Sequence, residues 1–312
     1  MKPIRTVFLG TPEFAAVILK ELLDSDSVEV AGVFTQPDRQ GGRGRKTLEP
    51  EVKKLARERD LPVYQPLRMD REHIRVLENL DPEALAVAAY GTILDRRVLD
   101  VPALGAVNVH ASLLPSYRGA APMQRALLNG ERVTGVSTML MEEGLDTGPV
   151  LQQRETAIAV QETAGTLHDR LAQKGAHLLR NSLIGLRKDS LIPLRQDSGR
   201  ASHAPKLEKR ERYIEWDQTA WQVHNRIRAL HPVPGAVFSL QPRRADTALQ
   251  VRAHPGQIGM EAANSPPGAI LGLSPQGLLR IACRDRVYLL STLQPESRKP
   301  LSAREFWNGY LT

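Results

Sequence analysis

The chain has 312 residues, enough for two domains that each bury a core, and two is the expected number. Its 42 Lys and Arg residues outnumber 35 Asp and Glu residues, which gives a formal charge of +7. Residues 1–188 carry 25 basic and 24 acidic side chains, whereas residues 189–312 carry 17 and 11. The basic C-terminal part suits either a polyanionic partner or a simply soluble surface.

The single cysteine, Cys283, excludes a disulfide framework and a multi-cysteine metal site. We expect it to be a core residue in a reducing compartment. No apolar run approaches the roughly 20 residues that span a bilayer. The apolar segment 6–10 begins too early to leave room for a signal peptide. The sequence therefore predicts a cytoplasmic protein, and no apolar surface stripe argues for more than a monomer.

Short apolar runs alternate with helix-period segments through residues 1–188. We expect strands within residues 6–10, 28–36, 61–65, 83–91, 105–113 and 135–141. The helical pattern covers residues 12–25, 49–60, 70–80 and 163–188. This alternation predicts an α/β, Rossmann-like domain with a mostly parallel sheet. The opening FLGTPEF is not a dinucleotide fingerprint, because it lacks the second and third glycines.

The loop 37–46, PDRQGGRGRK, interrupts this regularity with four basic side chains among three glycines. It does not match a phosphate-binding P-loop, because Arg45 stands where that motif needs glycine. Such a run is either a solvated surface loop or a cationic finger that grips nucleic-acid phosphates. Its candidate contact residues are Arg39, Arg43, Arg45 and Lys46.

Residues 189–208 lose the periodicity and are interpreted as an extended basic linker. The remaining residues, 209–312, begin with a helix at 219–232. Short strands then follow, separated by turn residues, at 236–240, 248–254, 268–274, 277–283 and 287–293. Five such strands predict a small OB-like β-barrel. Aromatic residues make up only 4% of the chain, so a barrel that binds nucleic acid would use backbone electrostatics rather than base stacking.

The stretch NVHASLLPSYRGAAP, residues 108–122, holds the strongest candidates for chemistry. Strand geometry places Asn108 and His110 on one face, with Val107 and Val109 on the other. Downstream, the loop GLDTGPV supplies the carboxylate of Asp146. An amide, an imidazole and a carboxylate beyond strand ends suit polar chemistry at the mouth of a parallel sheet. On their own, Asn108 and His110 are more often a structural hydrogen-bond pair than catalytic residues. An Asp beside glycine more often caps a turn.

With these residues in view, the chain resembles the 10-formyltetrahydrofolate-dependent formyltransferase family. The pattern N-x-H-x-S-L-L-P-x-Y-R-G-x-x-P, followed some 30 residues later by G-x-D-T-G, is that family's signature. The site alone leaves the formyl acceptor open, because members that act on glycinamide ribonucleotide or UDP-aminosugars share it. Three other stretches resemble the members that act on methionyl-tRNA: TQPDRQGGRGRK, SHAPKLEKRERYIEW and LQPESRKPLSAREFWNG.

The resemblance implies a formyltransferase that uses 10-formyltetrahydrofolate as donor and initiator methionyl-tRNA as partner, without a metal. It implies catalytic roles for Asn108, His110 and Asp146. It assigns the folate pocket to two loops, with the residues Ser112, Leu113, Leu114, Pro115, Ala89, Tyr90 and Gly91. Together with the local charge it implies tRNA contacts at Lys206, Lys209 and Arg210, besides those of the 37–46 loop. The resemblance covers nearly the whole chain.

Three rival interpretations remain to be compared. Asp146-Thr147-Gly148 matches the aspartic-protease triplet, but that mechanism needs a second facing carboxylate, which the sequence does not supply. A non-catalytic RNA-binding protein would bind RNA without reduced folate. An aminosugar formyltransferase is disfavoured by the arginine-glycine finger.

Overall fold

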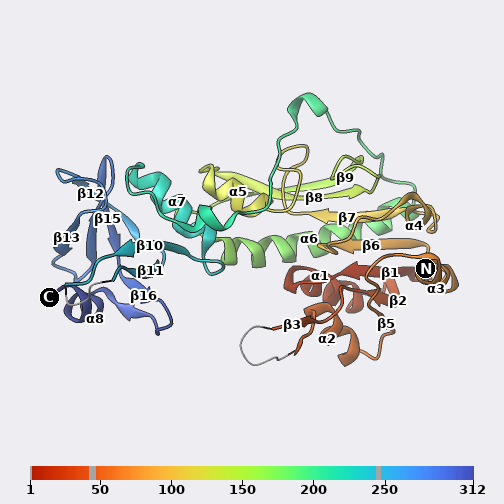
Figure 1. The fold of residues 1–312 in the computed structure, drawn as a ribbon. Helices are drawn as coiled ribbons and strands as arrows, with labels where there is room; N and C mark the ends of the chain where they lie inside the picture. Colours follow the sequence, from red (N-terminus) through yellow and green to blue (C-terminus); the bar gives the residue numbers. More distant parts are fainter. Residues whose placement is uncertain (1, 42–46, 244–246) are drawn as a thin grey trace. The chain divides into compact units, whose positions relative to one another are not determined.

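The computed structural model describes residues 2–41, 47–243 and 247–312 (Figure 1). The chain divides into two compact units, each assembled from three segments. The first unit comprises Met1–Gly119, Thr134–Thr156 and His168–Ala204. The second comprises Ala120–Val133, Ala157–Leu167 and Pro205–Thr312. Of the predicted linker 189–208, residues 189–204 are thus part of the first unit and residues 205–208 part of the second.

A seven-stranded sheet forms the centre of the first unit within the described residues, in the order β5-β2-β1-β6-β7-β8-β9. Its strands β5, β2, β1, β6 and β7 are parallel, and β8 runs antiparallel to β7. The strand bounds are Val63–Tyr64 for β5, Val28–Phe34 for β2, Ile4–Gly10 for β1, Ala84–Ala88 for β6, Ala106–His110 for β7, Val133–Leu140 for β8 and Val150–Ala157 for β9. The predicted mostly parallel α/β sheet is confirmed.

Helices cover both faces of this sheet because its strands are apolar on both sides. On one face, a Cβ added at Gly175 of α6 would lie 2.7 Å from Val109 of β7, so helix and strand are in close contact there. The other face carries a buried cluster that includes Val7, Val87 and Leu77. The helices are α1 (Glu13–Leu23), α2 (Glu51–Glu58), α3 (Arg71–Asn79), α4 (Arg96–Leu99) and α6 (Ala164–Arg187). The predicted long helix 163–188 matches α6 closely.

Several elements were not predicted from the sequence, among them α4, β9, α5 and the strands β3 and β4. Strand β9 reads VLQQRETA and buries only Leu151, because it is an edge strand with little apolar patterning. Helix α5, Pro122–Leu128, begins inside the signature stretch with Pro122 at its first position. Its seven residues are too few for a clear helical period. The short hairpin of β3 (Arg39–Gln40) and β4 (Thr47–Leu48) closes the base of the 37–46 loop.

The second unit holds helix α7 (Ala220–Leu230) and two four-stranded antiparallel sheets among its described residues. The orders are β10-β11-β16-β17 and β12-β15-β14-β13. Their bounds are Ala236–Leu240 for β10, Leu249–Ala253 for β11, Gln257–Ala262 for β12, Ile270–Leu273 for β13, Leu279–Ala282 for β14, Arg286–Leu290 for β15, Thr292–Pro295 for β16 and Leu301–Ser302 for β17. The sequence missed β12 and β17, which are polar or very short, and did not divide β15 from β16.

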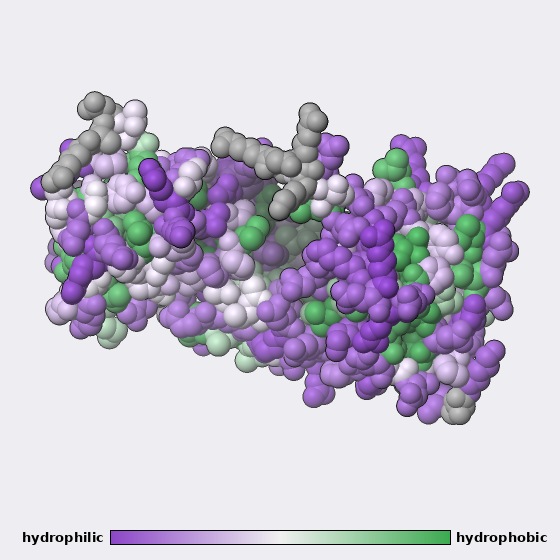
Figure 2. All heavy atoms as spheres, turned by 90° about the horizontal axis from the view of Figure 1, so that it is seen from below, coloured by the Kyte–Doolittle hydropathy of each residue, from purple (hydrophilic) through white to green (hydrophobic). Residues whose placement is uncertain are grey.

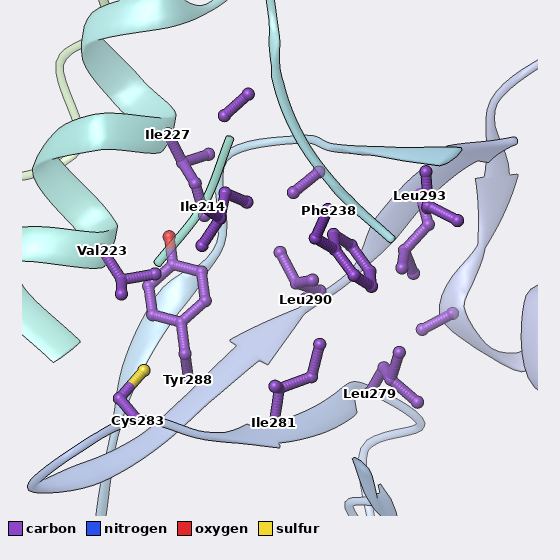
Figure 3. Close-up of a cluster of buried hydrophobic side chains, with 14 of the residues drawn as sticks. Ile214, Val223, Ile227, Phe238, Leu279, Ile281, Cys283, Tyr288, Leu290 and Leu293 are labelled. Atoms are coloured by element: carbon purple, nitrogen blue, oxygen red, sulfur yellow. The ribbon is translucent and has the colours of Figure 1, made fainter. Parts of the chain in front are cut away.

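Aliphatic and aromatic side chains from α7 and both sheets meet in one core, where Tyr288, Phe238, Ile281 and Leu293 lie together (Figure 3). Short helical segments complete the second unit: η2 (Lys209–Arg212), α8 (Ala303–Phe306) and η3 (Trp307–Leu311). The turn η1 (Ser198–Arg200) belongs to the first unit. Burial raises the pKa of the Cys283 thiol in this core to about 12.

A buried polar network ties α7 to the strands of the second unit. His224, 1% exposed, lies with Nε2 2.8 Å from the Val160 carbonyl and Nδ1 3.0 Å from the Tyr288 hydroxyl. Since a carbonyl only accepts, Nε2 carries the hydrogen and Nδ1 accepts from Tyr288. The Gly256 amide in turn donates to the Tyr288 oxygen over 3.1 Å. Burial lowers the pKa of His224, so the ring is held neutral.

In the part of the chain that the structure describes, every helix is too short or too polar to cross a lipid bilayer.

Candidate functional site

Strand β7 presents Asn108 and His110 on the same face, as the two-residue period predicts. Asn108 lies between Val87 of β6 and Met139 of β8 in the sheet register, and His110 lies beside Ser137. His110 is 6% exposed, whereas Asn108 is more open. The Asn108 side chain makes no hydrogen bond to the described residues. Its amide is thus available to a ligand at the carboxyl end of the sheet.

The His110 ring is held by a hydrogen bond at Nε2 and faces a carboxylate with Nδ1. Nε2 lies 2.9 Å from the Tyr117 carbonyl oxygen, so it carries a hydrogen and donates it. Nδ1 lies 3.6 Å from Oδ2 of Asp146, too far for a direct hydrogen bond and close enough for an ion pair when the ring is protonated. The nitrogen that faces the carboxylate is therefore Nδ1, and the site brings His110 and Asp146 together from segments 36 positions apart in the printed sequence.

Asp146 is held in an uncommon backbone conformation. Its φ of +53° lies in the left-handed region, which aspartate tolerates better than most residues. Its Oδ2 accepts a 2.8 Å hydrogen bond from the Gly119 amide. Gly119 itself has φ +120°, and a Cβ there would lie 2.8 Å from the Ala204 carbonyl oxygen. Only glycine fits this position without a shift of the backbone.

The Ser112–Pro115 loop is stabilised by one hydrogen bond of its own and by side chains of β8 and β9. The Ser112 hydroxyl donates to the Ser116 carbonyl over 2.6 Å, and the Ser137 hydroxyl accepts from the Leu114 amide over 3.1 Å. Gln153 donates to the Leu114 carbonyl over 2.8 Å. Ser112 and Leu114 are buried, so Leu113 and Pro115 are the members of this loop with surface available to a ligand.

The loop after β6 lies at the point where the strand order reverses, since β1 and β6 are neighbours while the chain passes from β1 to β2 and β5 first. Open α/β sheets bind ligands at this point. Ala89 and Gly91 are exposed with positive φ, and nothing lies within 4 Å of a Cβ added at Gly91. The Tyr90 side chain points inward, with its hydroxyl 3.7 Å from Met69 Sδ, and burial raises its pKa to about 12.

The basic candidates lie on the surface where the structure describes them. Arg39 is exposed in β3, and Lys206, Lys209 and Arg210 are exposed in the second unit. Arg43, Arg45 and Lys46 lie outside the described residues. Arg210 is paired with Glu208 over 2.7 Å, which offsets part of its charge. Figure 2 shows a face on which hydrophilic side chains predominate between small hydrophobic patches.

The base of the 37–46 loop has an ion pair of its own. Lys53 of α2, 5% exposed, lies 2.6 Å from Asp38 and 3.1 Å from Glu49. The Lys53 ammonium, together with the Gln65 amide, lowers the pKa of Asp38. The first residues of the loop are therefore fixed to the sheet domain.

Sequence reasoning missed two residues that support the Asp146 loop: Gln196, which contacts it, and Arg118, which contacts Gln196. Arg118 is buried, and its guanidinium donates to Gln196 Oε1 over 3.0 and 2.8 Å. An arginine inside the signature stretch was a usable signal. Gln196 gave none, because it lies in a segment without periodicity.

The first unit is an open α/β sheet, and an amide, an imidazole and a carboxylate lie beside the point where its strand order reverses. This combination is typical of a doubly wound α/β enzyme. Family comparisons narrow that class. The model described as Formyl transferase matches residues 4–183, and that described as Formyl transferase, C-terminal domain, matches residues 206–311. The chain belongs to the formyl transferase family.

Curated relatives match along nearly their whole length. The protein named methionyl-tRNA formyltransferase of Nitratidesulfovibrio vulgaris (strain DP4) is 44% identical over 312 residues, which cover 99% of this chain and 94% of the relative. That of Pseudomonas syringae pv. tomato is 44% identical over 309 residues, covering 99% and 95%.

Solved structures at low identity share the fold. HypX from Aquifex aeolicus, in complex with tetrahydrofolic acid, gives a TM-score of 0.65 at 16% identity over 99% of this chain and 48% of HypX. WlaRD, a sugar 3N-formyl transferase, gives 0.63 at 16% identity over 96% of this chain and all of WlaRD. The similarity to these structures is a similarity of fold.

Proposed function

We propose that this protein transfers the formyl group of 10-formyltetrahydrofolate to the α-amino group of methionine on initiator methionyl-tRNA. The observation that carries the proposal is the sequence similarity: the chain is 44% identical to a relative named methionyl-tRNA formyltransferase and covers 94% of it. The same chain brings His110 and Asp146 within 3.6 Å of each other. We also propose that the protein is a monomer and acts in the cytoplasm.

The acceptor amine needs little activation. An α-amino group has a pKa of about 7.7 to 8.0, so a useful fraction is neutral near pH 7.5. The amine nitrogen attacks the formyl carbon, and the carbonyl oxygen gains negative charge as the tetrahedral intermediate forms. The main task of the site is therefore to stabilise that oxygen and to remove a proton from the nitrogen.

Asn108 is the candidate donor to the oxyanion. Its amide is partly exposed and has no hydrogen-bond partner among the described residues, so it needs no rearrangement to bind a ligand oxygen. His110 is positioned on the same strand face. Its Nε2 hydrogen is directed to Tyr117, so a direct donation from the ring to the oxyanion would use a protonated Nδ1.

Asp146 is the candidate for the proton transfer. Its Oδ2 lies 3.6 Å from the His110 Nδ1, so the two atoms can face one bound amino group together. The carboxylate then accepts the proton of the attacking nitrogen, directly or through His110. The same proton is available to the folate nitrogen as it leaves.

The residues at the carboxyl end of β6 and β7 fit the formyl donor. Ala89 and Gly91 offer exposed backbone beside open space, and Leu113 and Pro115 offer partly exposed apolar surface. A flat heterocycle needs this combination of backbone hydrogen bonding and apolar contact. The tRNA contacts are assigned to Arg39, Arg43, Arg45, Lys46, Lys206, Lys209 and Arg210, which would bind phosphates.

One experiment tests the proposal. The purified protein is incubated with 10-formyltetrahydrofolate and methionyl initiator tRNA, and the esterified methionine is analysed for a formylated amino group. Free methionine, an aminosugar nucleotide and glycinamide ribonucleotide serve as alternative acceptors. Formylation of the tRNA-bound amine supports the proposal. Formylation of a different acceptor alone, or RNA binding without affinity for reduced folate, overturns it.

A further inference from the structure

We infer that Gln196 is a positioning residue that sets the place of the Asp146 carboxylate, a role that rests on the proposed function of Asp146. Gln196 lies in the first unit, in the extended segment 189–204. Its neighbours Arg195 and Asp197 are exposed, whereas Gln196 itself is partly buried. Of these three residues, Gln196 is the one whose side chain is directed toward the Asp146 loop.

Arg118 fixes the orientation of the Gln196 amide. Two guanidinium nitrogens of Arg118, Nε and Nη2, lie 3.0 and 2.8 Å from the same oxygen, Oε1. A guanidinium only donates, so the atom facing it is the amide oxygen, and Nε2 points the other way with both hydrogens. Because Arg118 is 6% exposed, water competes little for this contact.

The two hydrogens of Nε2 bind the main chain of the Asp146 loop. They are donated to the Asp146 carbonyl over 2.9 Å and to the Gly148 carbonyl over 2.7 Å. Gly148 packs closely against the end of β8, because a Cβ added there would lie 1.8 Å from the Leu140 carbonyl oxygen. The loop is thus held between strand β8 and the Gln196 amide.

This contact stabilises a backbone that is costly by itself. Asp146 has φ +53°, in the sparsely populated left-handed region, so its conformation needs support from the surroundings. Gln196 supplies this support on the main chain, and the Gly119 amide supplies it on the side chain over 2.8 Å. Arg118 and Gly119 are adjacent, so one short segment sets both contacts. Without Gln196, the carboxylate keeps its chemistry and loses its fixed distance to His110.

The substitution Gln196→Glu isolates this role. The glutamate is of similar size and still accepts from Arg118, but as a carboxylate it donates nothing to the Asp146 and Gly148 carbonyls. We expect kcat for tRNA formylation to fall about 10- to 100-fold, since a misplacement near 1 Å costs up to about a hundredfold. The KM for 10-formyltetrahydrofolate should stay within about twofold. Gln250→Glu, at an amide that donates to Tyr213 in the second unit, is the matched control and should keep wild-type kcat.

Two further readouts separate positioning from loss of stability. In an Asp146→Asn background, Gln196→Glu should lower kcat by no more than about twofold, because the two residues act through one group. Hydrogen exchange of the Gly119 amide should accelerate in Gln196→Glu while the amides of β7 keep their protection.

A uniform acceleration of exchange, or an undiminished loss of kcat in the Asp146→Asn background, overturns the inference. If the wild-type protein formylates methionyl-tRNA and Gln196→Glu does so equally well, the inference fails and the proposed function stands. A wild-type protein without this activity contradicts the proposed function instead. In that case an unchanged exchange rate of the Gly119 amide in Gln196→Glu would also reject the positioning role of Gln196.

Discussion

The Gly119 amide donates a 2.8 Å hydrogen bond to the same Asp146 oxygen, Oδ2, that lies 3.6 Å from His110 Nδ1. One carboxylate oxygen therefore connects the end of β7, the turn that follows it and the loop after β8. A change at any of the three should alter the site.

Gly119→Ala should disturb this arrangement most directly. The added Cβ would lie 2.8 Å from the Ala204 carbonyl in a backbone with φ +120°, so the turn must shift. We expect about 1 to 3 kcal/mol lower stability and a kcat lowered up to about a hundredfold. Urea denaturation and steady-state formylation measure the two effects. Gly309→Ala, where a Cβ meets nothing within 4 Å, is the control that should stay near wild type.

Asn108→Ala should remove the candidate oxyanion donor while leaving the sheet intact. Loss of one such donor typically lowers kcat about 10²- to 10³-fold. The KM for the folate donor should change little, because the bond forms to charge that develops during the reaction. Asn181→Ala, at an exposed asparagine of α6, is the control. A loss confined to KM would show that Asn108 binds the ground state.

The basic residues Lys206, Lys209 and Arg210 should give tRNA binding its salt dependence. Each phosphate contact contributes about 0.9 to the slope of log affinity against log salt. Because Arg210 is already paired with Glu208, the triple alanine variant should lower the slope by about two rather than three. Filter binding between 50 and 200 mM salt measures it. Alanine at the exposed Arg68, Arg71 and Arg75 removes the same charge and should leave the slope unchanged if the assignment is correct.

The second unit should lose stability in mild acid. His224 has a lowered pKa because it is buried, so below its ordinary value of 6.5 the unfolded chain takes up a proton that the folded ring rejects. Stability is therefore full above that value and falls as the pH drops from about 7 toward 5. Trp216, Trp221 and Trp307 all lie in this unit, so tryptophan fluorescence during urea unfolding reports on it.

His224→Gln should reduce this pH dependence. His231 and His254 also have pKa values lowered by burial, so part of the dependence should remain. An identical pH slope in the variant and the wild type would show that His224 does not carry the effect. The variant is expected to be less stable at pH 7.5, because the Val160 and Tyr288 contacts change.

The sequence predicted the parts of the fold that have strong periodicity. The sheet strands with buried faces and the helix α6 follow from alternation and spacing, and so does the common face of Asn108 and His110. Strands β9 and β12 each bury a single residue, so no apolar pattern marks them. The bonds from Arg118 to Gln196 join residues 78 positions apart, and only the folded loops bring them together. The inward orientation of Tyr90 and the internal bond of Ser112 likewise depend on packing that local sequence does not specify.

The burial of Cys283 has a practical consequence. The chain has one thiol, 1% exposed and with a pKa raised to about 12, so almost none of it is the reactive thiolate at neutral pH. A cysteine introduced at an exposed position would then be the sole target for a maleimide dye. Labels placed one at a time along the surface would map how each part of the molecule responds to its partners, without first removing a native residue.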